Sequence, residues 1–346
     1  MMQLIKKRCQ DSKRIDWIDT AKGLGIILVV LGHTWDIPHW LYCAIYGFHM
    51  PLFFLLSGLT CNFDGEISTR KYIIQQFFRY MRPYMVLCGA NLILQCMWLM
   101  YVGSFQCEML LKYICGIIYC YANTEWMPNC SPLWFLPGIM FAKIFAFAAY
   151  RLARSNKYRA TGVVVFLTVF AMLCNYLKVP RLPWNILPAM VGSVFVWAGY
   201  CLRSDDRFMQ TGYGKITDAL IIAALLLTPW IVWNCPGMNQ NYYDNGLLFV
   251  ISGFGYSFLL IRIAMLLRNN RFLTSFLGKG TMVIMGFNYF ARTMAIEIYY
   301  LIPVVRNYPI RPIACFPITM TILMLMLLCK NRLQEKTEGR HASHAV

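Results

Sequence analysis

Apolar residues gather along this chain in long runs that short polar segments separate. A transmembrane helix needs about 20 predominantly apolar residues. The pattern predicts ten spans, which are residues 19–38, 41–63, 83–102, 133–150, 160–177, 186–202, 216–234, 245–267, 281–303 and 312–329. The predicted fold is therefore an all-α integral membrane protein, not a pair of soluble domains.

The polar segments between these runs define the predicted organisation. Residues 1–18 form a basic cytoplasmic lead, and residues 64–82 a polar cytoplasmic loop. The longest outside loop, 103–132, contains the apolar stretch MLLKYICGIIYCY, which is too short for a span and is expected to be a re-entrant or interfacial helix. Residues 19–329 form the transmembrane domain, and the polar tail 330–346 is expected to be disordered and cytoplasmic.

Composition supports a membrane protein. Of the 346 residues, 59% are hydrophobic and only 14% are charged, and the mean hydropathy is +0.51. Soluble domains carry about 25% charged residues. The length alone would suggest two soluble domains, and the composition overrides that suggestion.

The net charge of +17 has a positional explanation. With the N-terminus in the cytoplasm, the inside segments hold 25 of the 32 lysines and arginines, the outside segments hold 5, and Lys143 and Arg292 lie within spans. This asymmetry follows the positive-inside rule and predicts that both termini are cytoplasmic. The excess of basic residues therefore indicates orientation and contact with anionic lipid headgroups, and it predicts no nucleic-acid partner.

The fourteen cysteines show no CxxC pair and no zinc-like spacing, so no metal site is predicted. Four of them share the outside region 103–132, and these are Cys107, Cys115, Cys120 and Cys130. A disulfide within this loop is one alternative, and free thiols are the other. The sequence does not fix a connectivity.

The stretch KGLGIILVVLGHTW, residues 22–35, places a histidine inside the first predicted span. His33 follows Lys22, at the inner edge of that span, by roughly 16 Å of helix. The chain then turns near Trp40, and His49 lies roughly 13 Å back along the second span. Because the hydrocarbon core is about 30 Å thick, adjacent antiparallel helices would hold His33 and His49 at a similar depth.

Two histidines at one depth predict a functional site, because polar side chains within spans are costly and rare. A neutral buried imidazole can accept a proton from a hydroxyl nucleophile. The alternative is that both rings only bond across helices as packing contacts. His39 is expected to be solvated at the outer surface, and His341 and His344 are expected to have no role in the tail. Asp36, near His33, is expected to be a solvated acid at the end of its helix.

Several motifs resemble the membrane-bound acyltransferase-three family, in particular its fucose 4-O-acetylase-like branch. In that family an aspartate precedes a basic residue by three positions and a histidine by fourteen, and here Asp19, Lys22 and His33 occupy these positions. The other matching segments are FHMPLFFLLSG at 48–58, RYMRPY at 79–84, SPLWFLPGIMF at 131–141 and FLGKGTMVIMGFNYF at 276–290. Many relatives have a histidine where this chain has Asn288.

The resemblance implies a membrane-embedded O-acyltransferase that moves an acetyl group from cytoplasmic acetyl-CoA to a hydroxyl of a sugar or glycolipid, in a bacterial inner membrane. Residues 19–329 would then be the acyltransferase domain. The roles that follow are expectations: His33 as general base with His49 as its partner or relay, Lys22, Arg79 and Arg82 on the CoA phosphates, and Ser57, Asn288 or a backbone N–H as the oxyanion stabiliser. Arg292 and Glu297 would bind substrate or pair with another helix, and Lys143 needs an internal partner.

Other interpretations stay open. A proton-coupled transporter would also place histidines within spans, but it predicts paired repeats and broken helices, neither of which the sequence shows. A silent family member that serves as a membrane partner is the third possibility. The outer aromatic residues would either stack on a sugar or form an interfacial belt, with the belt favoured, and they are Trp126, Trp134, Trp230, Trp233, Tyr242 and Tyr243.

Overall fold

The computed structural model describes residues 15–34, 36–65, 67–304, 307–308 and 310–343, with side chains described as far as residue 335. No β-strand occurs in these ranges. Residues 1–14 of the predicted cytoplasmic lead lie outside these ranges, and so does His344.

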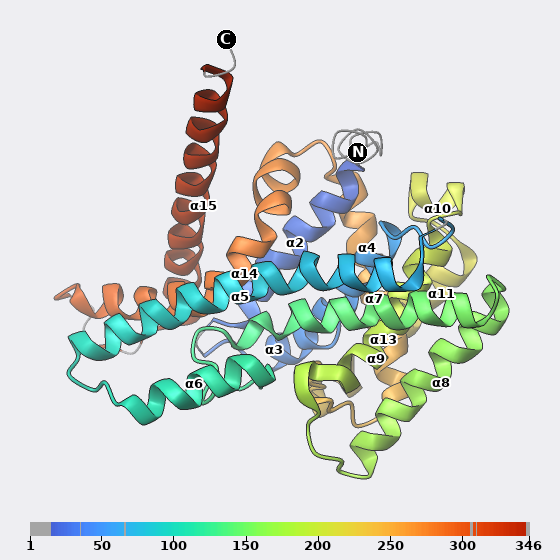
Figure 1. Cartoon of the computed structure of the whole chain (residues 1–346), viewed down its shortest axis with the longest axis horizontal. Helices are drawn as coiled ribbons and strands as arrows, with labels where there is room; N and C mark the ends of the chain where they lie inside the picture. The colour runs from blue at the N-terminus through green and yellow to red at the C-terminus, as the bar shows by residue number, and fades with distance from the viewer. Residues whose placement is uncertain (1–14, 35, 66, 305–306, 309, 344–346) are drawn as a thin grey trace.

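The α-helices are α2 (Asp16–Gly32), α3 (His39–Tyr46), α4 (His49–Leu59), α5 (Thr69–Tyr101), α6 (Cys107–Tyr119), α7 (Phe135–Leu152), α8 (Lys157–Tyr176), α9 (Ile186–Leu202), α10 (Asp206–Thr211), α11 (Lys215–Leu226), α12 (Thr228–Asn234), α13 (Gly246–Leu266), α14 (Gly278–Leu301) and α15 (Pro312–Ser343) (Figure 1). Short 3₁₀ segments are η1 (Ser131–Trp134), η2 (Pro183–Asn185) and η3 (Met238–Gln240), and η4 (Phe272–Leu277) is a π-helical segment before α14.

The described residues contain 7 helical segments that are long and apolar enough to cross a membrane, and the bent pair α11–α12 makes an eighth. The seven are His39–Leu59, Thr69–Tyr101, Ser131–Leu152, Lys157–Tyr176, Pro183–Leu202, Gly246–Leu266 and Pro312–Glu335. The chain is thus an all-α integral membrane protein. The first predicted span corresponds to α2, with 17 residues, and the ninth to α14, with 24 residues that include three charged side chains. The total of ten stays a prediction.

The first two spans differ from their predicted shapes. Helix α2 ends at Gly32, six residues before the predicted end, and His33 is its C-cap. The second span is broken at Gly47 and Phe48, so that His49 begins α4. A second break bends α11 against α12 by 53°. In both cases the break lies beside the disulfide-linked segment described below.

Two segments that were predicted to be irregular are helical. Most of the region 64–82 is not a loop, because α5 begins at Thr69, where the Ser68 hydroxyl caps the helix by accepting from the Lys71 N–H. Tyr72 and Gln76, one turn apart, then bury one face of this polar stretch. The tail also continues α15 to Ser343, since extending an existing helix with good helix formers costs little. The predicted short helix in the outside loop is confirmed as α6.

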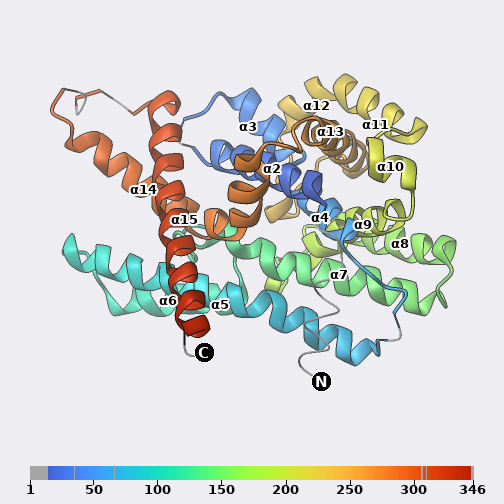
Figure 2. The ribbon, with the colours of Figure 1, turned by 90° about the horizontal axis from the view of Figure 1, so that it is seen from above.

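Helix α2 lies at the centre of the bundle because glycines allow close backbone approach. A Cβ at Gly23 would collide with the carbonyl oxygen of Leu273 in η4, and a Cβ at Gly278 would collide with that of Asp19 in α2. Small residues at helix contacts are typical of membrane bundles. The other face of α2 packs against α4 and α13, while α5 lies alongside α7 (Figures 1 and 2).

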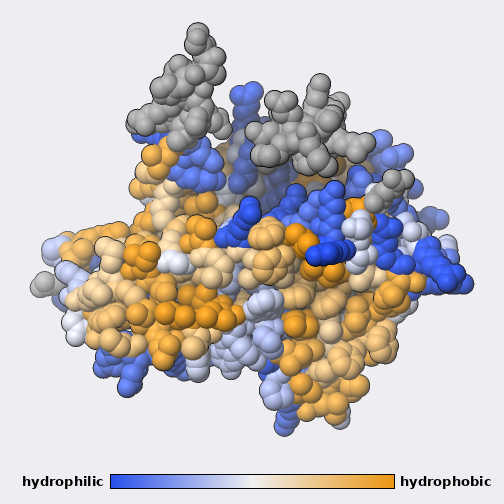
Figure 3. Space-filling model, viewed as in Figure 1, coloured by the Kyte–Doolittle hydropathy of each residue, from blue (hydrophilic) through white to orange (hydrophobic). Residues whose placement is uncertain are grey.

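The outer helices present apolar surface. Only 22% of the most apolar stretch of α5 is buried, against 78% of that in η1–α7. Orange, apolar residues dominate the face over α5 and α8, and polar residues gather above them (Figure 3). In water such a surface would aggregate, whereas in a bilayer it is the surface that faces lipid.

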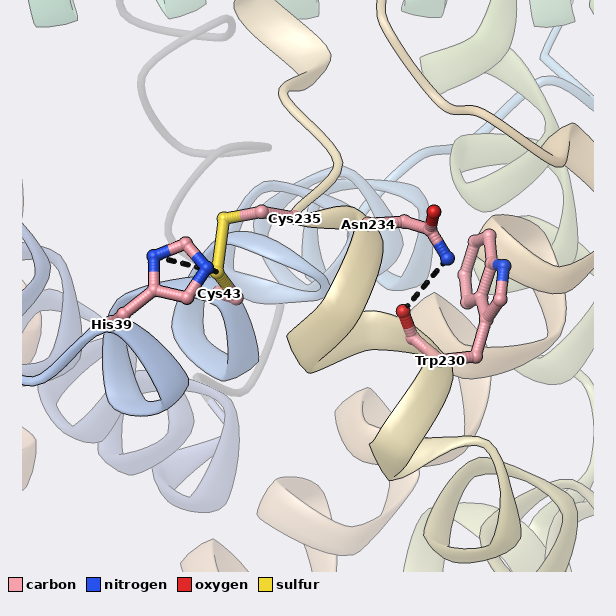
Figure 4. Close-up of a disulfide and its surroundings, with 5 residues drawn as sticks. All are labelled: His39, Cys43, Trp230, Asn234 and Cys235. Atoms are coloured by element: carbon pink, nitrogen blue, oxygen red, sulfur yellow. Dashed lines mark hydrogen bonds between the residues drawn. A yellow bond between two sulfur atoms is a disulfide. The ribbon is translucent and has the colours of Figure 1, made fainter.

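A disulfide joins Cys43 of α3 to Cys235, the residue after α12, across 192 positions of sequence (Figure 4). The four cysteines of the outside loop are all free, so a disulfide among them is not formed. The reason is placement. Cys120 and Cys130 are buried in the packed core, and Cys107 and Cys115 are exposed on α6.

Candidate functional site

Two cavities enter the bundle from different helix ends. The histidine cavity has a volume of about 340 Å³ and is lined by His33, His49, tyrosines and loop amides. The basic cavity has a volume of about 1080 Å³ and is lined by basic residues near the start of α2 and α14. The predicted functional residues of the first two spans line one cavity or the other.

The histidine cavity brings His33 and His49 together, as the spacing predicted. The ring of Tyr46 lies between them, with ring centroids 5.6 Å from His33 and 4.9 Å from His49. The break at Gly47 makes this possible, because it places Tyr46 at the end of α3 and His49 at the start of α4. The two imidazoles therefore face a common tyrosine as well as the cavity.

Hydrogen bonding fixes which nitrogen of His49 carries its proton. Its Nδ1 lies 2.8 Å from the carbonyl oxygen of Ile45. A carbonyl can only accept, so Nδ1–H donates and the lone pair resides on Nε2. His49 thus holds a basic nitrogen in a defined position.

The partners of His33 are hydroxyls, which donate or accept. Its Nδ1 lies 2.8 Å from the Tyr46 hydroxyl and 3.5 Å from that of Tyr289. When Nδ1–H donates to Tyr46, the Nε2 lone pair of His33 is free to act as a base. A carboxylate partner is not needed for this orientation, and the predicted solvated state of Asp36 agrees with its exposure.

Arg292 of α14 contacts the backbone of His33. Its guanidinium donates to the His33 carbonyl oxygen at 3.3 Å and lies 4.4 Å from the Tyr289 ring centre. Its Nε is buried and has no partner among the described residues, and the same holds for Nδ2 of Asn288, one turn earlier. The structure therefore makes Arg292 a neighbour of the histidine and leaves two buried donors on one face of α14.

The basic cavity gathers cations from five elements. The basic side chains on its wall are Lys22, Arg79, Lys143, Arg203 and Lys279, and the acidic one is Asp19. Lys22 Nζ lies 3.0 Å from Asp19 Oδ1. Lys143 is buried, and its predicted internal partner is the Tyr80 hydroxyl at 3.1 Å. An excess of positive charge in a cavity of this size suits a large anionic ligand.

Three of the predicted site residues do not line the cavity that their expected role requires. Arg82 is exposed and stacks on Phe78, outside the basic cavity. Ser57 lines the basic cavity, and its hydroxyl donates to the Phe54 carbonyl, two helical turns from His49. Glu297 is exposed at the far end of α14. The structure thus groups Lys22 with Arg79, and His33 with His49 and Arg292.

Each of three helices lines both cavities with one stripe. On α4 the stripe is His49, Phe53 and Ser57, at intervals of four residues. The corresponding stripes are Lys22, Ile26, Val29 and His33 on α2, and Gly278, Met282, Met285 and Tyr289 on α14. These intervals of three and four residues keep one helix face turned inward. The two cavities therefore lie along one axis of the bundle.

Part of the wall of the histidine cavity is polar and comes from loops. Loop residues supply side-chain amides and one cation, namely Asn123, Asn239, Gln240 and Arg181. Of the outer aromatic residues, Trp134 and Tyr242 line the cavity, whereas Trp233 is 86% exposed on the surface. Trp134 and Tyr242 therefore remain candidates for stacking on a sugar, and the exposed Trp233 suits an interfacial belt.

Tyr46 and Tyr289 are the site residues that sequence reasoning missed. Tyr46 precedes His49 by three positions, which is the helical interval for a shared face. Tyr289 follows Asn288 within the late segment of the resemblance. A search for hydroxyls one turn from His49 would have named Tyr46, but not its contact with His33, which depends on the break at Gly47.

One group of possible metal ligands occurs among the described residues, formed by His39, Cys43 and Cys235 (Figure 4). The two sulfurs are bonded to each other and offer no thiolate. The His39 ring is exposed, with Nε2 3.4 Å from Cys43 Sγ. This group therefore serves as a covalent link between α3 and the segment after α12.

Comparison with protein families matches the acyltransferase-three profile, described as an acyltransferase domain, over residues 15–329. The chain therefore belongs to this family and is a membrane acyltransferase. No curated protein and no solved structure matches it. The predicted family is confirmed, the fucose 4-O-acetylase-like branch stays a prediction, and the family gives no support to the transporter alternative.

Proposed function

We propose that this acyltransferase moves an acetyl group from cytoplasmic acetyl-CoA to a hydroxyl of a cell-surface glycan or a lipid-linked sugar in a bacterial inner membrane. The observation that carries the proposal is the pair of cavities with opposite chemistry along one axis of the bundle. One suits an anionic donor, and the other suits a polar acceptor beside two imidazoles.

The basic cavity is the donor site of this proposal. Acyl-CoA carries several phosphate charges, and Lys22 and Arg79 would bind them as the sequence predicted. Lys143, Arg203 and Lys279 join this set because they share the same wall. Lysine suits a phosphate as a compact charge, and arginine suits it as a two-donor fork.

The distribution of loops supports the proposed orientation. The histidine cavity is lined in part by segments predicted to lie outside, which are 122–124, 131–132 and 235–240, with Tyr242. The basic cavity is lined in part by Thr60, Arg79, Arg203 and Lys279, from segments predicted to lie inside or at their edges. The Cys43–Cys235 disulfide also joins the outer end of the second predicted span, 41–63, to a predicted outside segment, where an oxidising environment would preserve it.

The histidine cavity is the acceptor site. Side-chain amides and aromatic rings are the groups that hold a sugar, through hydrogen bonds to hydroxyls and contact with the ring face. Asn239, Gln240, Trp134 and Tyr242 provide these groups on the wall of the cavity.

The proposed reaction uses His33 as the base. Its Nε2 takes the proton of the acceptor hydroxyl while the hydroxyl oxygen bonds to the thioester carbon. The C–S bond then breaks, and the departing CoA sulfur receives a proton by way of the imidazole. His49, with its Nε2 lone pair, would relay this proton. A backbone N–H or the unpartnered Nδ2 of Asn288 is proposed to stabilise the oxyanion.

The test uses purified protein in lipid vesicles, labelled acetyl-CoA and a panel of glycans and lipid-linked sugars. His33→Ala should lower transfer by about 10²–10⁴-fold, the usual contribution of a general base. The exposed His39, outside both cavities, supplies the matched control, and His39→Ala should retain transfer.

Transfer that survives His33→Ala would remove that residue from the mechanism. Complete absence of transfer by the wild-type protein, with every glycan offered, would oppose the proposal itself. Accumulation of label on the protein would indicate an acyl-histidine intermediate in place of direct transfer.

A further inference from the structure

Among the residues that the structure describes, only Phe53 and Met285 line both cavities. Phe53 lies on α4, four residues after His49 and four before Ser57. Met285 lies on α14, four residues before Tyr289. Both side chains are half-buried, which is the exposure expected of groups that separate two open volumes.

The position of Phe53 is constrained on two sides. A Cβ at Gly25 of α2 would lie 3.1 Å from its ring, so the ring rests against the bare backbone of α2. Its other side contacts Phe135 of α7, with ring centroids 5.9 Å apart. An aromatic ring held between two helices has little freedom to move, so Phe53 forms a rigid part of the boundary between the two cavities.

Met285 forms the flexible part of the boundary between the two cavities. Methionine is unbranched and has three rotatable bonds, so it can change shape around a passing group at low cost. It belongs to the inward stripe of α14 and packs at the margin of the core. The boundary between the cavities therefore has one rigid and one flexible wall.

We propose that Phe53 and Met285 form the aperture through which the acyl thioester reaches the histidines, and that they set the length of the acyl group that is transferred. This inference rests on the proposed function, since the donor must enter through the basic cavity. The aperture would admit the thin pantetheine arm, and it would place the acyl group beside Phe53 and Met285 when the thioester carbon is at His33.

The size of the histidine cavity makes the aperture selective. Its volume of about 340 Å³ must hold the acceptor hydroxyl, part of its sugar and the acyl group together. A longer acyl chain would have to fold back against Phe53 and Met285. Removing one of these side chains creates the space that a longer chain needs, because a packed core does not otherwise yield volume.

The first experiment measures kcat/KM for acetyl-, butyryl- and hexanoyl-CoA with one accepted glycan. In Phe53→Ala and Met285→Ala, the hexanoyl-to-acetyl ratio should rise about tenfold over wild type, since a few methylenes in a shaped pocket are worth this much discrimination. Phe53→Leu should give a smaller rise and serves as the second variant if the alanine protein does not fold.

Met320→Ala is the matched control. Met320 lies on α15 and is buried against the cluster formed by α2, η4 and α14, outside both cavities. It should lose stability as Met285→Ala does, and it should keep the wild-type ratio.

The second experiment closes the aperture. Met285→Trp should bind CoA from the basic cavity with a dissociation constant close to that of wild type, while acetyl transfer falls about tenfold or more because the thioester no longer reaches His33. Retained CoA binding also shows that the variant is folded.

The outcomes separate the two proposals. If wild type transfers acetyl and the aperture variants keep its chain-length ratio, the inference is overturned and the proposed function stands. If Met285→Trp transfers acetyl at the wild-type rate, the route between the cavities lies elsewhere. Absence of transfer by wild type from any acyl-CoA would overturn the proposed function, and this inference with it.

Discussion

The hydroxyl of Tyr46 lies 2.8 Å from Nδ1 of His33. The same tyrosine ring separates His33 from His49, which donates its own Nδ1–H to the Ile45 carbonyl. One tyrosine at the end of a short helix thus adjoins both imidazoles. When Tyr46 accepts this hydrogen bond from Nδ1–H, the lone pair on Nε2 of His33 is free to act as the base.

Tyr46→Phe should lower kcat for acetyl transfer about tenfold, the effect of losing one orienting hydrogen bond. The ring remains, so packing between the histidines is preserved. The KM for acetyl-CoA should change little, because Tyr46 lies in the histidine cavity, away from the basic cavity.

Tyr113→Phe is a suitable control for the loss of a tyrosine hydroxyl, since Tyr113 is buried on α6, outside both cavities. Equal kcat values for Tyr46→Phe and wild type would show that the hydroxyl does not orient His33.

The sequence predicted the histidine pair because helix geometry is regular. A fixed rise per residue and a turn near Trp40 were enough to bring His33 and His49 to one depth. The contact with Tyr46 depended on the break at Gly47, which a run of apolar residues does not reveal. The disulfide joins residues 192 positions apart, and no local pattern encodes such a pairing.

The cation assignments on α5 depended on a rotation of the helix that the sequence did not show. Arg79 and Arg82 are three residues apart, and each was expected to bind phosphate. Only Arg79 faces the basic cavity, since the burial of Tyr72 and Gln76 sets the rotation of α5. That rotation could not be predicted while the segment 64–82 was expected to be a loop.

The two arginines of α5 give a direct test of that rotation. Arg79→Ala should raise the KM for acetyl-CoA about tenfold with little change in kcat, because a charged hydrogen bond to phosphate is worth about 1.5–3 kcal/mol. Arg82→Ala should leave this KM close to wild type, since its guanidinium stacks on Phe78 at the surface. Steady-state kinetics over a range of acetyl-CoA concentrations measure both. A rise in KM for Arg82→Ala equal to that for Arg79→Ala would favour the assignment made from sequence.

The Cys43–Cys235 disulfide should stabilise the wall of the histidine cavity, since Cys235 lines it. Replacing both cysteines by serine should lower the melting temperature, because removing a disulfide usually costs about 2–4 kcal/mol. A reductant should lower the melting temperature of wild type and leave that of the double variant unchanged. The exposed pair Cys107 and Cys115, when replaced by serine, should not alter the response to reductant. A wild-type protein that melts identically with and without reductant would contradict this role.

The segment between α4 and α5 should stabilise the protein in a pH-dependent manner. The Asp64 carboxylate accepts hydrogen bonds from the Tyr150 and Tyr200 hydroxyls at 2.7 and 2.8 Å. The bond from Tyr150 is the largest cause of a pKa below the ordinary value of 3.8, with smaller contributions from Tyr200, Lys157 and Arg203, and burial opposes them.

Because the folded-state pKa of Asp64 is lowered, the unfolded chain binds its proton first as the pH falls. The stabilisation is complete well above pH 3.8 and decreases as the pH drops through the ordinary pKa towards the lowered one. Asp64→Asn should therefore melt below wild type near neutral pH, and the two melting curves should converge in acid. Asp206→Asn, an exposed acid at the start of α10, is the matched control. A difference between Asp64→Asn and wild type that stays constant from neutral pH to acid would show that the charge of Asp64 does not contribute, and that only its shape does.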